Sequence, residues 1–340
     1  MSILNFIIRV FFGIIEKYLI PAKPLVPINK NGYQFVCLLE QKNSKYKVCV
    51  YKNSLGEKVL IKQLSYKLPT LAYNQLINEA RVLSFVNKYV TQKSSSIVQF
   101  PELISLIIKK NSVTLIRKFI DGKTLSSYPI SIKFSLITQA FSTLKGLSKN
   151  TDDLEKIGLP KKSPYQIFVS YPVYFVLAIA KDIRQTVVFL HITNVFIKCY
   201  LIPFFSYEKL QTKYIFSHRD LHLNNIIIQN NKAYIIDMGI SLLAEETTDL
   251  ARIAQTYYSS FGIAKVTKLI FTCAKTPEMQ MKFLGLTIYY TLQMLATENP
   301  NSLDYKHAKA YTKALTTYII PLFMSNIAFI SYPSKQIKYA

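Results

Sequence analysis

Three kinds of residue are scarce in this 340-residue chain. Tryptophan is absent, cysteine occurs four times and glycine nine times. The cysteines form no C-x-x-C pair and no zinc-finger spacing, so we expect reduced, buried thiols in a cytoplasmic protein. No stretch follows the G-x-x-x-x-G-K-[ST] pattern, which excludes a P-loop nucleotide site.

Acidic side chains are also scarce. The chain has 42 lysines and arginines against 19 aspartates and glutamates, which gives a formal net charge of +23. That charge favours an anionic partner, such as a nucleotide, a phospholipid headgroup or an acidic glycan, although a spread of surface lysines would also produce it. Because no block of basic residues typical of nucleic-acid binding occurs, we expect no nucleic-acid partner.

The N-terminal segment 1–30 is predicted to be separate from the rest of the chain. Its first part, 1–20, is mostly apolar, with a polar stripe that recurs every three or four positions, and Pro21, Pro24 and Pro27 follow. Without a basic start or a cleavage site, this amphipathic helix is not expected to be a secretory signal. Packing on the protein is the favoured interpretation, and peripheral contact with an anionic membrane is the alternative. The uncharged stretch 314–334 offers a similar choice, in which a core helix is favoured over a membrane anchor.

Two carboxylates and a carboxamide stand at intervals that suit phosphoryl transfer. Asn225 and then Asp237 follow Asp220 within a short stretch of the chain. The β-branched stretches 225–229 and 232–236 flank Asn230-Asn231, which predicts a hairpin that returns Asp237 to the loop carrying Asp220. Acidic and amide oxygens gathered there suit Mg²⁺ that bridges nucleotide phosphates.

These residues resemble the catalytic core of the protein-kinase-like superfamily. His218–Leu221 with Asn225 matches the H-R-D-L-x-x-x-N motif, and Asp237–Gly239 matches the D-x-G element. The resemblance implies that Asp220 orients and deprotonates the acceptor hydroxyl, and that Asn225 and Asp237 hold the metal.

Upstream, the pattern predicts a small β-rich region with one helix. Strands are expected at 33–39, 46–52, 58–64 and 112–119, and a helix at about 71–87. Lys62 ends a Val-Leu-Ile-Lys stretch that looks like the V-A-I-K strand of kinases, and Glu79 lies on the helix that follows. The resemblance implies that Glu79 braces Lys62 against the nucleotide phosphates.

The two ends of the expected nucleotide site differ in how well they match the family. The turn at 40–45 contains no glycine where protein kinases carry a G-x-G-x-x-G loop, so backbone amides approach the phosphates less freely, and the turn's two lysines and its serine are candidate substitutes. The stretch Ile120–Leu125 resembles the hinge of aminoglycoside-phosphotransferase-like enzymes. That likeness implies that backbone groups of Lys118, Phe119 and Ile120 bond the adenine edge.

Two features favour a small-molecule or glycan kinase over a protein kinase. His222 stands at a position where protein kinases generally have lysine and aminoglycoside-type enzymes have histidine. The interval between Asp237 and Asp249 is too short for a long activation segment. Asp249 is expected to cap a D-L-A-R helix start like that of aminoglycoside and choline phosphotransferases. Arg219, in contrast, departs from the aminoglycoside-type pattern, because those enzymes usually have glycine there. Lipopolysaccharide-core sugar kinases, however, also use H-R-D.

The predicted fold class is α+β, a bilobal protein-kinase-like fold. Its parts are an N-terminal helix and Pro-rich linker (1–30), a nucleotide-binding lobe (31–120) and a helical catalytic and substrate-binding lobe (121–340). With ATP and Mg²⁺ as cofactors, the expected activity is transfer of the γ-phosphoryl group to a hydroxyl of a small molecule, a sugar or a lipid-linked glycan. A catalytically silent pseudokinase, acting as a nucleotide-binding or scaffolding module, is the alternative, which the glycine-free turn favours; a protein kinase is less favoured.

Overall fold

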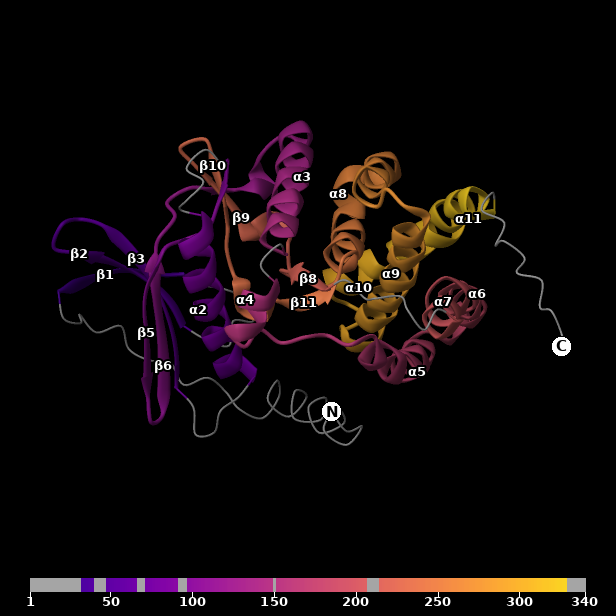
Figure 1. Ribbon diagram of the computed structural model, residues 1–340, viewed down its shortest axis with the longest axis horizontal. Coiled ribbons are helices and arrows are strands. Elements are labelled where there is room, and N and C mark those ends of the chain that lie inside the picture. The colour runs from indigo at the N-terminus through magenta and orange to yellow at the C-terminus, as the bar shows by residue number, and fades with distance from the viewer. Residues whose placement is uncertain are drawn as a thin grey trace. The chain divides into compact units, whose positions relative to one another are not determined.

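The computed structural model describes residues 32–39, 47–65, 71–90, 97–148, 151–206 and 214–328. The chain forms two compact units. The first unit comprises the residues up to Lys161 together with Tyr214–Leu243, and the second comprises Lys162–Lys213 and the residues from Ala244 onward. These boundaries do not coincide with the predicted lobe boundary after residue 120. Figure 1 labels the elements of both units.

The first unit contains a five-stranded antiparallel sheet in the order β1-β2-β3-β6-β5. Its strands are β1 (Tyr33–Leu39), β2 (Lys47–Asn53), β3 (Lys58–Ser65), β5 (Leu103–Lys109) and β6 (Ser112–Lys118). Four of these confirm the predicted strands with nearly the same ends, and β5 was not predicted. The register places Lys62 of β3 opposite Leu115 of β6.

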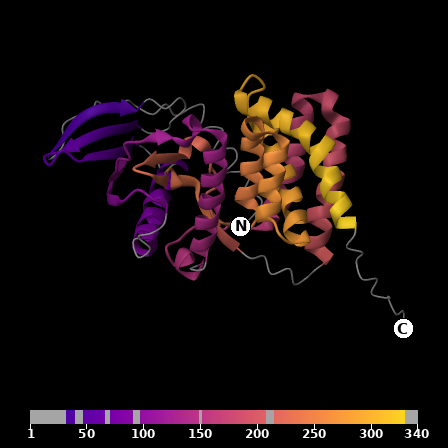
Figure 2. The ribbon, with the colours of Figure 1, turned by 90° about the horizontal axis from the view of Figure 1, so that it is seen from above.

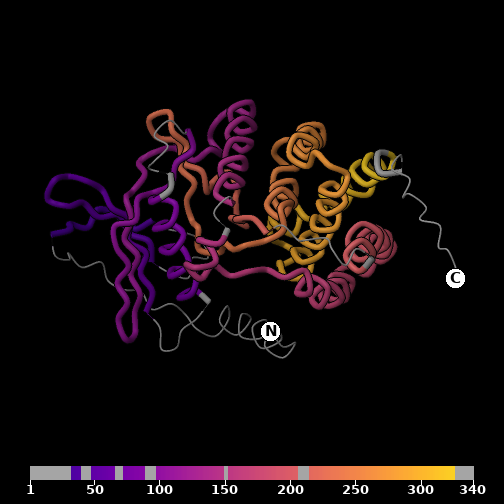
Figure 3. Tube along the Cα trace, viewed as in Figure 1, coloured from indigo at the N-terminus to yellow at the C-terminus, as the bar shows by residue number. Residues whose placement is uncertain are grey.

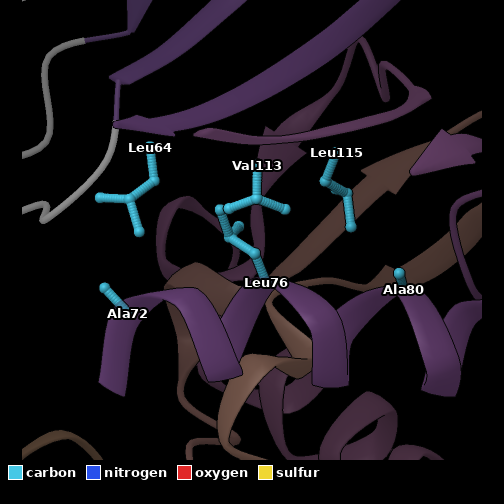
Figure 4. Packing of buried hydrophobic residues seen from close by; sticks show 6 residues of the cluster. All are labelled: Leu64, Ala72, Leu76, Ala80, Val113 and Leu115. Carbon is cyan, nitrogen blue, oxygen red and sulfur yellow. The ribbon is translucent and has the colours of Figure 1, made fainter. Parts of the chain in front are cut away.

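Helix α2 (Leu71–Val90) packs on this sheet and confirms the predicted helix. Figure 4 shows the strand side chains of this core facing those of the helix: Leu64, Val113 and Leu115 against Ala72, Leu76 and Ala80. Alternate residues of a strand point to the same face of a sheet. Val113 and Leu115 therefore place the next alternate residue, Arg117, on the face that α2 covers.

A second sheet of the first unit joins segments from both sides of residue 120. Its order is β4 (Val98–Gln99), β10 (Lys232–Ile235), β9 (Ile226–Gln229) and β7 (Lys123–Thr124). Strand β4 runs parallel to β10 and β7 runs antiparallel to β9. This pairing is the reason why the segment from Tyr214 to Leu243 belongs to the same unit as the predicted nucleotide lobe. The unit also contains α3 (Ile130–Leu147), α4 (Thr151–Lys156) and β8 (Tyr214–Ser217).

Gly122 is required by the approach of its backbone to β9. A Cβ atom at this position would lie 2.2 Å from the carbonyl oxygen of Ile228 and 2.9 Å from the Cγ2 atom of Ile227. No side chain fits at such distances, so the turn between β6 and β7 needs a glycine because of space, not because of its backbone angles.

The second unit is helical. Its main helices are α5 (Pro164–Lys181), α6 (Thr186–Phe196), α7 (Ile202–Ser206), α8 (Thr248–Cys273), α9 (Pro277–Thr297), α10 (Leu303–Ala314) and α11 (Ile320–Ala328). Helices α8, α9 and α10 pack against one another, as Figure 2 shows. Helix α8 is kinked at Gly262, whose φ is 70°. Asp249 lies inside the first turn of α8, because the cap residue is Thr247; the prediction of a cap at Asp249 is wrong by two positions.

The described part of the chain contains one helix that is long and apolar enough to cross a membrane by composition. It runs from Ile183 to Phe205 with a mean hydropathy of 1.7, and 39% of its most apolar stretch is buried. The predicted N-terminal helix lies outside the described residues. Within the described part of 314–334, Leu315, Ile319 and Phe323 are fully buried, as expected for a core helix.

The four cysteines are all free thiols, as predicted, but they are not all buried. Burial raises the pKa of Cys199 to about 11 and also raises that of Cys49. Cys37 is exposed and Cys273 is partly exposed. The prediction is wrong for Cys37 because β1 is an edge strand, and its register shifts between Phe35 and Cys37.

Candidate active site

The hairpin predicted between Asp220 and Asp237 is present, and Figure 3 traces it. Strands β9 and β10 pair Ile228 with Ala233 and Ile226 with Ile235. Asn230 and Asn231 have φ angles of 49° and 59°, the positive values that a two-residue mirror-image turn requires. Asparagine tolerates this conformation better than most residues, so the turn chemistry fixes the strand pairing that leads to Asp237.

His218 joins the loop of Asp220 to the strand end before Asp237. The ring is fully buried; its Nδ1 accepts a hydrogen bond from the backbone N–H of Asp220 at 3.2 Å. Its Nε2 therefore carries the proton and donates to the carbonyl oxygen of Ile236 at 2.9 Å. One side chain thus holds the backbone at residue 220 and at residue 236.

Asn225 turns its side chain toward Asp220. Its Nδ2 donates to the backbone carbonyl of Asp220 at 2.8 Å and lies 3.3 Å from the Oδ2 atom of the same residue. The backbone carbonyl of Asn225 accepts from the N–H of Ile236 at 2.9 Å, which ties the loop to the residue before Asp237. With the amide nitrogen engaged, the Oδ1 atom of Asn225 is the one left to bind a cation.

His222 lies beside the carboxylate of Asp220. Its Nδ1 accepts from the backbone N–H of Asn224 at 3.2 Å, and its Nε2 lies 3.6 Å from the Oδ2 atom of Asp220. Both side chains are about one-third exposed, so the carboxylate of Asp220 can be reached by an acceptor.

Asp237 has a left-handed backbone with a φ of 63°, followed by the short 3-10 helix Met238–Ile240. Helix α2 holds the residues that follow it: the Nδ2 atom of Asn78 donates to the carbonyls of Gly239 and Ser241 at 3.0 and 2.8 Å. A Cβ atom at Gly239 would lie 3.2 Å from the carbonyl oxygen of Gln75, so this glycine lets the chain approach α2 closely.

The predicted pair of Lys62 and Glu79 is present and buried. The Nζ atom of Lys62 donates to the Oε2 atom of Glu79 at 2.7 Å, and these residues are 3% and 1% exposed. The same Nζ donates to the Oδ1 atom of Asp237 at 3.0 Å. The structure therefore brings Lys62, Glu79 and Asp237 together, and the hairpin bonds connect Asp237 to Asn225 and Asp220.

Charges shift the pKa values of these groups. Burial lowers the pKa of Lys62, but the carboxylates of Glu79 and Asp237 outweigh it and hold that pKa above its ordinary value. Burial raises the pKa of Asp237, but the ammonium of Lys62 outweighs it and holds that pKa below its ordinary value. Both partners of the ion pair are therefore charged at neutral pH.

Arg117 lies beside the Lys62–Glu79 pair, although no motif in the sequence indicated it. It is 2% exposed, and its Nε atom lies 3.6 Å from the Oε1 atom of Glu79. Burial lowers the pKa of Arg117 from its ordinary value, although Glu79 and Asp237 oppose this. The signal was the alternation of the strand, which puts Arg117 on the same buried face as Val113 and Leu115.

The backbone predicted to bond adenine is partly engaged in the sheet. The N–H of Lys118 donates to the carbonyl of Glu102 at 2.9 Å, and the N–H of Phe119 donates to the carbonyl of Lys58 at 3.1 Å. Of the three predicted residues, Ile120 is therefore the one whose amide remains as a donor. The glycine-free turn at 40–45 lies outside the described residues.

The residues at the end of β10 fit the coordination that Mg²⁺ adopts with nucleotides. No group of three or more His, Cys, Asp or Glu side chains gathers to hold a metal in the ranges that the structure describes. At nucleotide sites, Mg²⁺ is generally held by one or two protein oxygen ligands together with substrate phosphates and water. The Oδ1 atom of Asn225 and the partly exposed carboxylate of Asp237 are oxygen atoms of the kind that such a site uses.

Comparison with known proteins gives a likeness of fold. No protein-family model and no curated protein sequence matches the chain. Among solved structures, the chain is similar to an aminoglycoside phosphotransferase from Alicyclobacillus acidocaldarius subsp. acidocaldarius DSM 446, with a TM-score of 0.55 and 11% identity over 91% of this chain and 98% of that one. A thermostable mutant of aminoglycoside phosphotransferase APH(4)-Ia, in ternary complex with ADP and hygromycin B, has a TM-score of 0.55 and 12% identity over 83% of this chain and 93% of that one.

A third similar structure extends the likeness beyond aminoglycoside enzymes. The type I macrolide 2'-phosphotransferase has a TM-score of 0.52 and 12% identity over 83% of this chain and 92% of that one. At such identities the likeness concerns the fold. The chain therefore has the α+β fold of these small-molecule phosphotransferases, which confirms the predicted protein-kinase-like fold class.

Proposed function

We propose that this chain is an ATP- and Mg²⁺-dependent phosphotransferase that moves the γ-phosphoryl group to a hydroxyl of a small molecule, a sugar or a lipid-linked glycan. The observation that carries the proposal is the connected arrangement of the Lys62–Glu79 pair with Asp237, and of Asp237 with the loop of Asn225 and Asp220. Side chains from three separate parts of the sequence converge there, in the roles that phosphoryl transfer requires.

The carboxylate of Asp220 is the proton acceptor in the proposed reaction. The bond between the γ-phosphorus of ATP and its bridging oxygen breaks, a bond forms from the acceptor oxygen to that phosphorus, and the hydroxyl proton goes to Asp220. Asn225 and Asp237 would hold Mg²⁺, which supplies positive charge to the phosphate oxygens. Lys62, oriented by Glu79, neutralises phosphate charge, and the amide of Ile120 bonds the adenine edge.

The similar structures support this reaction class. One is named a phosphotransferase in complex with ADP and hygromycin B, and another acts on macrolides by name. The short connection from Asp237 to α8, which holds only the 3-10 helix and β11 (Leu242–Glu245), supports a small acceptor over a peptide. The acceptor is therefore proposed as a hydroxyl compound of low molecular weight or a glycan.

Replacing Asp220 tests the proposal. Asp220→Asn removes the proton acceptor without removing a nucleotide contact, so we expect turnover to fall by about 10²–10⁴-fold while the dissociation constant for ADP changes little. Turnover is measured as ATP consumption with Mg²⁺ over a panel of sugars, lipid-linked glycans, aminoglycosides and amino alcohols. Asp152→Asn, at an exposed position of α4, is the matched control.

Three outcomes would change the assignment. Near-normal turnover of Asp220→Asn would refute the role of Asp220. Binding of ADP with no turnover on any acceptor would favour the pseudokinase alternative. Failure of the wild-type chain to bind any nucleotide would refute the proposed function as a whole.

A further inference from the structure

Two buried cations share one buried carboxylate beside the candidate nucleotide site. The ammonium of Lys62 and the guanidinium of Arg117 approach opposite oxygens of Glu79, at 2.7 and 3.6 Å. A lysine–glutamate pair alone would be neutral. With Arg117 added, this buried group of three side chains carries one excess positive charge.

The balancing charge lies at the edge of the site. Asp237 pairs with Lys62, and its side chain is 36% exposed, whereas the side chains of Lys62, Glu79 and Arg117 are at most 4% exposed. The inner part of the site is therefore positive, and its counter-charge is on a group that faces outward. An anion that reaches Lys62 meets a field that Glu79 does not cancel.

The contact between Arg117 and Glu79 is too long for a strong structural ion pair. At 3.6 Å, the Nε atom of Arg117 and the Oε1 atom of Glu79 form no hydrogen bond, and neither atom has another partner in the part of the chain that is described. Buried charged atoms without hydrogen bonds lower stability, so fold stability alone does not account for an arginine here.

Arg117 also contacts the segment expected at the adenine edge. Its Nη1 atom donates to the carbonyl of Lys118 at 3.3 Å. The side chain thus lies between the Lys62–Glu79 pair and the backbone that leads to Ile120.

We propose that Arg117 is a positioning residue of the nucleotide site. Its guanidinium partly neutralises the carboxylate of Glu79, so that Glu79 cancels less of the positive charge of Lys62 and the site favours polyphosphate ligands. The inference rests on the proposed function, because it concerns the same nucleotide. Arg117 acts through Glu79 and Lys62. It gives the site a positive charge that does not depend on backbone amides of a glycine-rich loop, which the sequence lacks at 40–45.

The test compares nucleotides of different charge. ATP, ADP and adenosine are titrated against the full-length wild-type chain, Arg117→Met, Arg117→Lys and Lys110→Met. Lys110, in the exposed turn between β5 and β6, provides the same loss of charge outside the site. We expect Arg117→Met to weaken ATP and ADP binding by on the order of tenfold, while adenosine binding stays within about twofold. Arg117→Lys should recover most of the loss, and Lys110→Met should bind as the wild type does.

A purely structural role would give a different result. Arg117→Met would then lower the melting temperature and leave all three affinities unchanged, or weaken all three equally; either outcome overturns the proposal. If Arg117→Met does not fold, Arg117→Gln serves in its place, and wild-type affinity of that variant for ADP overturns the proposal as well. Failure of the wild type to bind ATP and ADP refutes the proposed function. If the wild type binds both and the Arg117 variants bind them equally well, only this inference is refuted.

Discussion

At the scale of single residues, Asp237 combines a left-handed backbone with a carboxylate bonded to Lys62. A non-glycine residue adopts that conformation only when its surroundings hold it there. Here the surroundings are His218, which bonds the carbonyl of Ile236, and Asn78, which bonds the carbonyl of Gly239. The backbone that carries this carboxylate is thus held on both sides.

Asp237 predicts how stability changes in acid. Because its pKa in the folded protein is below the ordinary value of 3.8, the ionised carboxylate stabilises the fold above that value, and the contribution is lost as the pH falls through the folded pKa. We expect the wild type to be more stable than Asp237→Asn at pH 6, and the difference to shrink once the pH falls below the ordinary value of 3.8, toward about pH 2. Urea unfolding across this range, without metal or nucleotide, measures it; a difference that stays constant with pH would contradict the ion pair.

Some contacts of the candidate site could be predicted from the sequence, and others could not. Lys62, Glu79 and Asp237 were singled out because each stands in a short local pattern that resembles a kinase motif, and the structure brings the three side chains together. Arg117 was missed because its partner, Glu79, lies on another element and no motif joins them. Local patterns identify candidate residues, but a contact between elements depends on how a helix is placed on a sheet.

At the scale of elements, the chain crosses strand β9 at Gly122 with no room for a side chain. Gly146, near the end of α3, is the opposite case, because no atom lies within 4 Å of the position that its Cβ would take. The two glycines therefore separate the effect of space from that of helix propensity.

Alanine substitutions at these two positions should have opposite effects. Gly122→Ala forces β7 away from β9, and we expect it to lower the free energy of unfolding by about 1–3 kcal/mol. Gly146→Ala should raise it by up to about 1 kcal/mol, since alanine favours the helix. Urea denaturation measures both, and a Gly122→Ala variant as stable as Gly146→Ala would show that the crossing is not close.

Elements with strong local signals were predicted well. The strands that end at Leu39 and near Lys118, the helix α2 and the hairpin around Asn230 were all expected from alternation, helical spacing or turn residues. Strand β5 was missed because its run of aliphatic residues from Leu103 has no clear period. The two-residue strands β4 and β7 exist only through pairing with β10 and β9, and no local pattern marks them.

At the scale of the whole molecule, the net charge of +23 acts on every part of the fold. Like charges repel one another over a distance that salt shortens, from about 30 Å at 0.01 M to about 8 Å at 0.15 M ionic strength. Repulsion among so many basic side chains lowers the stability of the compact state at low salt.

Added salt should therefore stabilise the protein. We expect the melting temperature to rise as sodium chloride increases from about 10 to about 150 mM, in the range where the screening length falls most. Sodium fluoride at the same concentrations distinguishes general screening from binding of chloride. A melting temperature that falls with both salts would mean that attractive ion pairs outweigh the repulsion.

The division of the first unit into two stretches of sequence affects the order in which it can be made. Strands β4 and β7 leave the ribosome before the helices between Pro164 and Ser206, while their partners β9 and β10 follow after them. At the usual rate of about 5–20 residues per second, β7 waits roughly 5–20 s for β9 to be synthesised. A nascent chain within that interval has unpaired strand edges, which makes the middle part of translation the step at which this fold most needs a chaperone.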